Sequence, residues 1–276
     1  MKTILVTGAS GYIGKHVIAA LNNQDIRVIG LSRTEPNDNL GIDYIKGDIF
    51  DGTDAILSLD TPIDACLHLA WGEGFVHNSP SHLLNFSAHY KFLKELMDAQ
   101  IPKIAVMGTM HEVGYWEGAI DENTPCNPLS LYGIAKNSLR SALLLDAQNS
   151  NTAIQWLRGY YIYGDDEQSH SIFGKLYRAA KSGETTFPFN SGKNKYDFIR
   201  IEDLAEQIAA CVLQDEVTGI INCCSGKPVS IGEQIENFIA DNNLQIELLY
   251  NSFPERPYDS PAVWGNNTKI MQILEA

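Results

Sequence analysis

The sequence predicts an α/β fold with a doubly wound parallel sheet and a smaller C-terminal lobe. Apolar, β-branched runs alternate with stretches of helical spacing, and a glycine-rich segment follows the first run directly. Strands buried on both faces form continuous apolar runs, and parallel strands are joined by crossover helices. The predicted strands are 3–6, 27–31, 63–69, 104–107, 153–157 and 220–223.

The helical segments follow from residue spacing. Ile13, Val17 and Leu21 recur at the spacing of one helical face, directly after the glycines. Two further helices are predicted over 131–147 and 202–213. Segments rich in Gly, Pro, Asn and Ser lie in the second half, where ligand-binding loops are expected. We therefore expect two units, a dinucleotide-binding domain over 1–164 plus 198–224 and a substrate-binding lobe over 165–197 plus 225–276.

Composition and charge narrow the classes of partner. The 276 residues, 44% of them hydrophobic, can bury a large core, and the net charge of −14 disfavours binding to nucleic acid. No apolar run approaches the roughly 20 residues that cross a bilayer, and no charged leader is apparent. The five cysteines lack the pairing of zinc sites. We expect a cytoplasmic protein with reduced thiols, no metal site and no membrane partner.

The segment TGASGYIG, residues 7–14, places three glycines between a strand and a helix. Gly8 can form the tight turn, Gly11 lets backbone amides approach a pyrophosphate, and Gly14 lets the helix pack closely on the sheet. The alternative is a tight turn that binds no ligand. The βαβ setting favours a dinucleotide site.

The end of the second strand bears on which dinucleotide is bound. NAD-binding folds usually place a carboxylate there for the ribose hydroxyls. This chain has Ser32 and Arg33 instead, and the first carboxylate is that of Glu35. A guanidinium pairs well with a ribose phosphate, so the sequence favours NADP(H) over NAD(H). The alternative is that Arg33 is a solvated surface charge.

A second motif, YGIAK, places Tyr132 and Lys136 four residues apart on a predicted helix. Their side chains therefore project from one face, where an ammonium would lower the pKa of the phenol toward neutrality. Such a phenol is an acid–base group for a carbonyl or an alcohol. Thr109, at the end of the 104–107 strand, could bind the reacting oxygen. The alternatives are a surface Tyr–Lys pair and a threonine that serves only as a cap.

The order of these and further motifs resembles one family. The match runs through nearly the whole chain and includes KGDIF, HLAW, GTMHEVG, DENTPCNPLSLYGIAK, LRGYYIYG, KYDFIRIEDLA, INCCSGKPVSI and ERPYD. Each motif alone is modest, whereas their order is specific. The chain resembles the extended short-chain dehydrogenases/reductases of the NAD-dependent epimerase/dehydratase family, which act on nucleotide sugars. This resemblance implies a Rossmann-type sheet and a nucleotide-sugar substrate.

The resemblance also implies roles for particular residues. Tyr132 would donate or accept the proton, Lys136 would lower its pKa and bind the nicotinamide ribose, and Thr109 would hold the substrate oxygen. The residues implied in cofactor binding are Gly8, Ser10, Gly11, Tyr12, Ile13, Gly14, Ser32, Arg33, Asp48, Ile49, Leu69, Ala70, Trp71, Asn85, Tyr132 and Lys136. Those implied in substrate binding are Trp71, Thr109, His111, Tyr161, His170, Lys195 and Arg256.

Some of these assignments are qualified by the sequence itself. Asp48 is implied near the adenine, although an Asp in a loop is as readily a turn cap. Asn85 resembles an Asn that supports the active-site network. Arg256 resembles an arginine that pairs with the nucleotide diphosphate, but Lys195 and Tyr196 stand where a second arginine is usual. A looser phosphate clamp is therefore expected.

Departures from the family pattern favour one reaction. Met110 and His111 stand where sugar-nucleotide 4,6-dehydratases carry an Asp-Glu pair, which disfavours dehydration. The 4-epimerases of the family usually retain NAD and have a larger C-terminal lobe, whereas this sequence ends with NNTKIMQILEA and carries a Ser-Arg pair at the ribose position, which disfavours such an epimerase. The resemblance thus implies NADPH-dependent reduction of the 4-keto group of a nucleotide-linked 4-keto-6-deoxy sugar, with a dTDP-linked substrate expected, to a 6-deoxyhexose.

Two alternative functions and one question of assembly stay open at this point. His111 and His170 have the side chain that an epimerase or an epimerase-reductase uses for acid–base chemistry. A non-catalytic NADP(H)-binding sensor of the same fold is a further possibility, which the Tyr132–Lys136 pair disfavours. The helices around 83–97 and 131–145 could form the seam of a homodimer, or their apolar stripes could belong to the core.

Overall fold

Seven parallel strands form the central sheet of the computed structural model, which describes residues 1–22, 24–34, 40–164, 167, 169–254 and 259–275. The strand order is β11-β7-β5-β4-β1-β2-β3, so the order reverses between β1 and β4. The bounds are β1 Lys2–Thr7, β2 Ile26–Ser32, β3 Asp43–Lys46, β4 Ala65–His68, β5 Lys103–Thr109, β7 Ala153–Gly159 and β11 Gly219–Cys223. Ligands in such sheets bind outside the carboxyl ends of the strands at this reversal.

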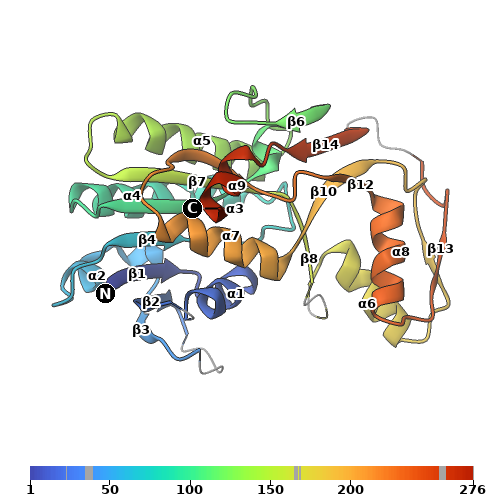
Figure 1. Cartoon of the computed structure of the whole chain (residues 1–276), viewed down its shortest axis with the longest axis horizontal. Coiled ribbons are helices and arrows are strands. Elements are labelled where there is room, and N and C mark those ends of the chain that lie inside the picture. The colour runs from blue at the N-terminus through green and yellow to red at the C-terminus, as the bar shows by residue number, and fades with distance from the viewer. Residues whose placement is uncertain (23, 35–39, 165–166, 168, 255–258, 276) are drawn as a thin grey trace.

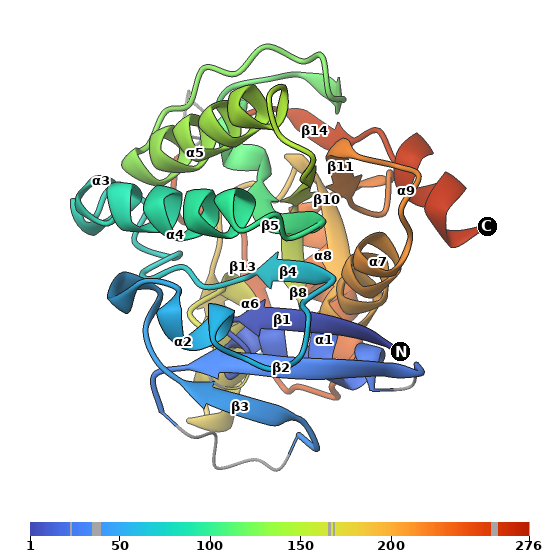
Figure 2. The ribbon, with the colours of Figure 1, turned by 90° about the vertical axis from the view of Figure 1, so that its left-hand side faces the viewer.

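Helices cover both faces of the sheet, each over its own apolar cluster (Figure 2). One face carries α1 (Tyr12–Leu21), α7 (Ile201–Leu213) and α9 (Thr268–Leu274), whose apolar side chains pack on β1 and β11. The other face carries α4 (Phe86–Asp98) and α5 (Leu131–Ala147), which pack on β4, β5 and β7. The remaining elements on this side are η1 Ile49–Asp51, α2 Asp54–Leu57, α3 Ser81–Leu84 and η2 Met110–Glu112.

A third apolar cluster, rich in aromatic rings, lies beside the sheet rather than on it. It is built around Phe173, Tyr196, Phe198 and Phe238. Its elements are β6 Gly118–Ile120, β8 Tyr161–Tyr163, α6 Ile172–Lys181, β9 Thr186–Pro188, β10 Lys195–Arg200, β12 Pro228–Ser230, α8 Ile231–Asp241, β13 Glu247–Leu249 and β14 Ala262–Gly265. Figure 1 shows α6, α8 and β13 at the end of the molecule away from the N-terminal strands.

The predicted fold class is confirmed, because the main sheet is parallel and helices flank both faces. The predicted helix over 131–147 coincides with α5. A single helix over 83–97 was expected, but the chain breaks at Asn85 into α3 and α4. The division into two domains stays a proposal that the separate aromatic cluster supports, but the packing differs from the predicted bounds, because α9 lies on the central sheet and β6 and β8 belong to the aromatic cluster.

Three general features bear on partners. None of the helices in the described part of the chain is long and apolar enough to cross a membrane. All five cysteines are free thiols. Among the described residues, no group of three or more His, Cys, Asp or Glu side chains is arranged to hold a metal ion. The cytoplasmic location stays a prediction.

Candidate active site

The turn from β1 into α1 has the shape that close approach of a ligand requires. Gly8 has φ +70°, and a Cβ there would lie 2.7 Å from the backbone nitrogen of Ala70. A Cβ on Gly14 would lie 2.2 Å from the carbonyl oxygen of Gly8. Gly11 is the N-cap of α1 and brings no side-chain hydrogen bond to the first turn. The backbone N–H groups of that turn can therefore bind a phosphate.

Some of the other residues implied in cofactor binding lie at this turn. The hydroxyl of Tyr12, at the start of α1 with Ile13, donates to the carbonyl of Gly164. Leu69 and Ala70 follow β4 directly, and the N–H of Ala70 donates to Thr7 Oγ1 at 3.3 Å. The strand ends β1 and β4 thus meet at the glycine turn, as the strand reversal predicts.

The end of β2 differs from the site that the sequence suggested. Ser32 is buried, and its hydroxyl lies 3.1 Å from that of Ser10. Arg33 is exposed. Asp48 accepts a hydrogen bond from the N–H of Phe50 at 3.1 Å and caps η1, which begins at Ile49. The turn-cap alternative for Asp48 therefore describes the structure.

Thr109 and Tyr132 are brought together at the end of β5. Helix α5 begins after Ser130, whose hydroxyl accepts a hydrogen bond from the N–H of Gly133 at 3.1 Å. A Cβ on Gly133 would lie 2.4 Å from the carbonyl oxygen of His111, so the glycine lets α5 approach η2 closely. This approach places the Tyr132 hydroxyl in a hydrogen bond with Thr109. Two of the three predicted catalytic residues are therefore adjacent.

Lys136 lies one turn further along α5 and is buried. Its ammonium donates to the carbonyl of Met107 at 2.7 Å and lies 3.8 Å from the centre of the Trp71 ring. Burial lowers the pKa of Lys136 to about 7, while the carboxylate of Glu112 acts in the opposite direction. Lys136 therefore holds only part of its charge at neutral pH.

The prediction that Lys136 lowers the pKa of the Tyr132 phenol is wrong. Within the described chain no hydrogen bond joins the two side chains, because the ammonium is bound by Met107 and Trp71. Burial raises the pKa of Tyr132, and the hydrogen bond with Thr109 opposes that rise only in part. The phenol is therefore neutral at physiological pH and suited to donate a proton.

Behind Thr109 lies a buried carboxylate that the sequence analysis did not identify. Glu112 is fully buried and accepts hydrogen bonds from Thr109 N–H at 2.7 Å and Trp156 Nε1–H at 2.8 Å. Arg158, also fully buried, lies 3.5 Å from its carboxylate, and Arg140 lies 3.8 Å away. The Thr-x-x-Glu spacing of Thr109 and Glu112 is a capping-box signal that could have revealed this residue.

A group of aromatic and imidazole rings covers Tyr132. His77 stacks on the phenol ring with centroids 5.5 Å apart, and His111 lies 4.5 Å from His77. Tyr161 lies 6.4 Å from His111. Burial lowers the pKa of His77 and lowers that of His111 to about 4. His111 and Tyr161 are thus gathered beside Tyr132 as neutral side chains, together with His77, which the motifs did not single out.

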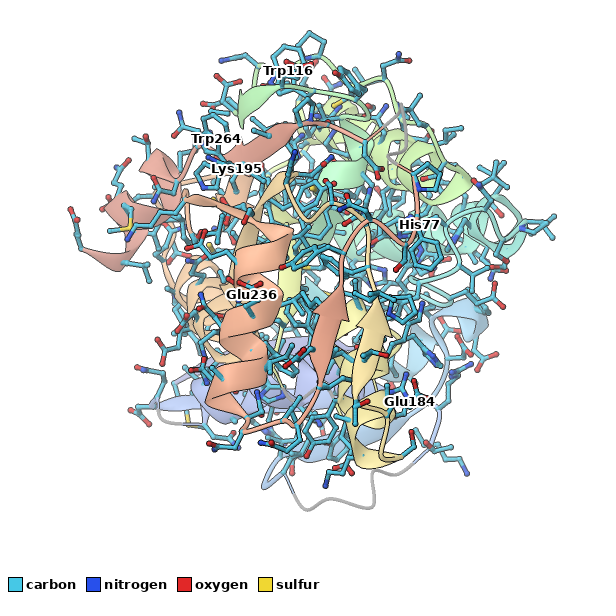
Figure 3. The ribbon with its side chains drawn as sticks, turned by 90° about the vertical axis from the view of Figure 1, so that its right-hand side faces the viewer. His77, Trp116, Glu184, Lys195, Glu236 and Trp264 are labelled. Atoms are coloured by element: carbon cyan, nitrogen blue, oxygen red, sulfur yellow. The ribbon has the colours of Figure 1, made fainter. Side chains whose placement is uncertain are left out.

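Other predicted site residues lie apart from this group. Lys195 is exposed on β10, and Figure 3 shows it beside Trp264 and well to the side of His77. His170 is exposed, with its ring 6.2 Å from that of Phe75. Asn85 stands at the junction of α3 and α4. Arg256 lies outside the described residues, so its contact with a diphosphate stays a prediction.

A family profile and a curated relative match this chain over most of its length. The profile of the "NAD dependent epimerase/dehydratase family" matches residues 4–224. A curated relative, "dTDP-6-deoxy-L-talose 4-dehydrogenase (NAD(+))" of Aggregatibacter actinomycetemcomitans, is 47% identical over 272 residues, which cover 95% of this chain and 98% of the relative.

Solved structures resemble the fold. The UDP-N-acetylglucosamine 4-epimerase of Methanobrevibacter ruminantium, in complex with UDP-N-acetylmuramic acid, has a TM-score of 0.84 at 23% identity, covering 99% of this chain and 91% of its own. The UDP-glucuronic acid 4-epimerase of Bacillus cereus, in complex with UDP-glucuronic acid and NAD, has a TM-score of 0.81 at 23% identity, covering 99% and 93%. At this identity the likeness concerns the fold alone.

The predicted preference for NADP(H) over NAD(H) is wrong. The relative at 47% identity is named for NAD(+), and the Bacillus cereus structure holds NAD. The prediction relied on Ser32 and Arg33 as a clamp for a ribose phosphate. In the structure the Ser32 hydroxyl is hydrogen-bonded within the protein and Arg33 is exposed, so the pair is a poor phosphate clamp.

Proposed function

This chain belongs to the NAD-dependent epimerase/dehydratase family, and on that premise we propose that it catalyses NAD-linked oxidoreduction at C4 of a dTDP-linked 6-deoxyhexose. The observation that carries the proposal is the 47% identity, over nearly the full length of both chains, to a relative named for this reaction. The broader prediction, an oxidoreductase of the extended short-chain dehydrogenase/reductase type, is confirmed by the family match and by this relative. The first substrate to test is dTDP-6-deoxy-L-talose.

The glycine turn fits the diphosphate of NAD. A Cβ at Gly8 would clash with the backbone of Ala70 and a Cβ at Gly14 with the carbonyl oxygen of Gly8, so these glycines keep the turn tight, and Gly11 leaves the N–H groups of the first turn of α1 without a side-chain cap. These residues would hold the diphosphate, and Lys136 would bind the nicotinamide ribose. When bound, NAD supplies the hydride acceptor or donor.

The proton transfer falls to Tyr132 in this proposal. In reduction of a C4 ketone the neutral phenol donates its proton to the oxygen as that oxygen gains the electron pair of the carbonyl bond. Thr109, hydrogen-bonded to the phenol, would donate to the same oxygen and stabilise its developing charge. The raised pKa of Tyr132 therefore favours reduction at neutral pH, and oxidation of the C4 hydroxyl requires the phenolate.

Glu112 supports this arrangement from behind. Its carboxylate fixes the backbone N–H of Thr109, and the buried guanidinium of Arg158 balances its charge. The sugar would lie against Trp71, His111 and Tyr161, which line the space around Tyr132 in the proposal. Neutral imidazoles can donate or accept hydrogen bonds to sugar hydroxyls without a charge penalty.

The proposal is tested by incubating the full chain with dTDP-6-deoxy-L-talose and NAD⁺ and following NADH absorbance. The sugar product is identified by mass spectrometry and NMR. A 4-keto product formed with equimolar NADH supports the proposal. A C4 epimer formed without net NADH would indicate an epimerase, which the neutral His111 near Tyr132 makes the second candidate. NAD binding without any turnover would indicate a sensor.

We also propose that the chain forms a homodimer through α3, α4 and α5. Leu84 and Leu145 are 76% and 63% exposed, and Leu83 and Ile134 are exposed as well. Figure 2 shows these helices side by side on one flank of the sheet. Light scattering of the wild-type chain and of a Leu84→Glu, Leu145→Glu double variant tests the proposal. A wild-type monomer would contradict it.

A further inference from the structure

Trp71, three residues beyond the end of β4, joins Lys136 to a set of buried histidines. The Lys136 ammonium lies 3.8 Å from the centre of the indole. His89 stacks on the same indole, with ring centres 4.3 Å apart and planes at 25°. An ammonium over an indole face is attracted by the ring quadrupole, most strongly where water is excluded. The position of the indole therefore fixes where a buried ammonium is best stabilised.

His89 is itself held by a buried hydrogen-bonded chain. Thr7 Oγ1 lies 2.9 Å from His68 Nδ1, and His68 Nε2 lies 2.9 Å from His89 Nδ1. All three side chains are buried. Burial and the nearby lysine charge lower the pKa of both histidines, that of His89 to about 3. A neutral imidazole donates through one nitrogen and accepts through the other, so the two hydrogen bonds of His68 run in the same direction along the chain, and the tautomer of His68 sets that direction.

His82 holds the indole of Trp71 through a hydrogen bond to its ring nitrogen. The Nε1–H of Trp71 donates to His82 Nδ1 at 3.1 Å, and His82 Nε2 lies 3.0 Å from the carbonyl oxygen of Val76. Trp can only donate and a carbonyl can only accept, so His82 is the neutral tautomer with its proton on Nε2. The indole is therefore fixed by a stacking contact and by a directional hydrogen bond.

The charged and titratable groups that face Lys136 come from three neighbouring elements. Glu112 of η2 favours the ammonium, while His68 of β4 and His89 of α4 are neutral. Tyr132 lies on the same helix and is also neutral. Glu112 is shared with two arginines, so it is a weak counter-ion for Lys136. The ammonium thus contacts the Met107 carbonyl at 2.7 Å and lies 3.8 Å from the centre of the indole.

We infer that Trp71 is a positioning residue that holds Lys136 charged and in place, and that the Thr7–His68–His89 chain and His82 hold Trp71. This inference rests on the proposed function, in which Lys136 serves the reaction. The Thr7–His68–His89 chain also connects the glycine turn with the region around Lys136, because Thr7 directly precedes Gly8. Replacing Trp71 should therefore act on Lys136 rather than on the fold alone.

The contact can be measured without cofactor or substrate. The full chain is labelled with 5-fluorotryptophan, and the four resonances, from Trp71, Trp116, Trp156 and Trp264, are followed by ¹⁹F NMR against pH. Trp71 is assigned from its absence in Trp71→Phe. We expect its resonance to titrate with a midpoint near 7, and Lys136→Met to abolish that titration while the other three resonances are unchanged. A Trp71 titration that survives Lys136→Met belongs to a histidine and overturns the inference, as does a flat Trp71 resonance.

The consequence for turnover is measured with two substitutions of different chemistry. Trp71→Leu keeps an apolar side chain without a ring, so the limb of the kcat–pH profile due to Lys136 should move to lower pH by about one unit, which lowers kcat about fivefold at pH 7 and about tenfold at pH 8. Trp71→Phe keeps a ring face and should stay within about threefold of wild type. Trp264→Leu, on β14, is the matched control and should leave the profile unchanged.

The outcomes separate this inference from the proposed function. A wild-type pH profile in folded Trp71→Leu overturns the inference while turnover still supports the function. A Trp71 resonance that titrates with Lys136, in a chain that oxidises no dTDP-sugar, supports the contact and overturns the function. If Trp71→Leu does not fold, His89→Phe replaces it, because this change keeps a ring stacked on Trp71 but breaks the hydrogen bond to His68. An unchanged ¹⁹F titration of Trp71 in His89→Phe would refute the role of the Thr7–His68–His89 hydrogen bonds.

Discussion

Replacing Glu112 by glutamine tests the support behind Thr109 most sharply. Glutamine keeps the shape of glutamate and can still accept the N–H of Thr109, which lies 2.7 Å from the carboxylate. It removes the charge that faces Arg158 at 3.5 Å, where both side chains are fully buried. Arg140, at 3.8 Å, loses part of its compensation as well. The change therefore leaves a buried guanidinium without its anion.

The expected size follows from that geometry. Removing one partner of a buried ion pair costs about 3–5 kcal/mol of folding free energy. In a chain of this length each kcal/mol lowers the melting temperature by roughly 2–4 °C, so we expect Glu112→Gln to melt roughly 6–20 °C below wild type. The measurement is thermal unfolding by calorimetry with NAD absent.

Two further variants make the result interpretable. Glu117→Gln alters an exposed carboxylate and should change stability by no more than about 0.5 kcal/mol. Adding Arg158→Met to Glu112→Gln removes the orphaned charge and should recover a large part of the loss, because an apolar side chain of similar volume is tolerated. A loss in Glu112→Gln as small as that of the exposed control would refute the reasoning, since it would mean that the two buried charges do not depend on each other.

Three more expectations concern the catalytic and cofactor residues. Tyr132→Phe should lower kcat by about 10²–10⁴ with little change in NAD affinity, whereas Tyr115→Phe, on an exposed loop, should leave kcat unchanged; turnover with NAD⁺ and calorimetric binding check this. Because burial raises the pKa of Tyr132 and lowers that of Lys136 to about 7, reduction, which uses the neutral phenol and the charged lysine, should fall as pH rises above neutrality, while the ratio of oxidation to reduction rates should rise with pH; a ratio that does not rise would contradict this sign. Gly8→Ala should weaken NAD binding at least about tenfold, since its φ is +70° and the new Cβ would meet Ala70, while Gly72→Ala, which meets nothing within 4 Å, should bind NAD normally.

The sequence predicted the frame of the molecule well, for a physical reason. Strands such as β5 and β7 are buried on both faces and therefore appear as continuous apolar runs, and α5 begins at a serine cap that marks its first residue. The short strands β9 and β13 have no such signal, because they pair only with each other and stay half-exposed. Tertiary contacts, rather than local pattern, fix those elements.

The site was predicted in part. Spacing alone placed Tyr132 and Lys136 on one helix face, but it did not show that a carbonyl and an indole bind the ammonium. The surrounding histidines come from separate segments, so no local pattern relates His77 to His111. The predicted preference for NADP(H) was wrong because Ser32 and Arg33, at the end of β2, were assigned to a ribose phosphate from their residue types alone. In the structure Ser32 is hydrogen-bonded within the protein and Arg33 is exposed. The role of a site residue depends on its burial and on its hydrogen-bond and ring contacts, and residue spacing in the sequence predicts neither.

The most direct test of the central claim follows the hydrogen at C4. dTDP-6-deoxy-L-talose carrying deuterium at C4 is incubated with NAD⁺ and the wild-type chain, and the nicotinamide product is analysed by mass spectrometry, with Tyr132→Phe as the control. The proposal predicts that deuterium appears in NADH with wild type and that its transfer is slowed by orders of magnitude in the variant. Turnover in which the nicotinamide gains no deuterium, or transfer that is as fast without the Tyr132 hydroxyl, would contradict it.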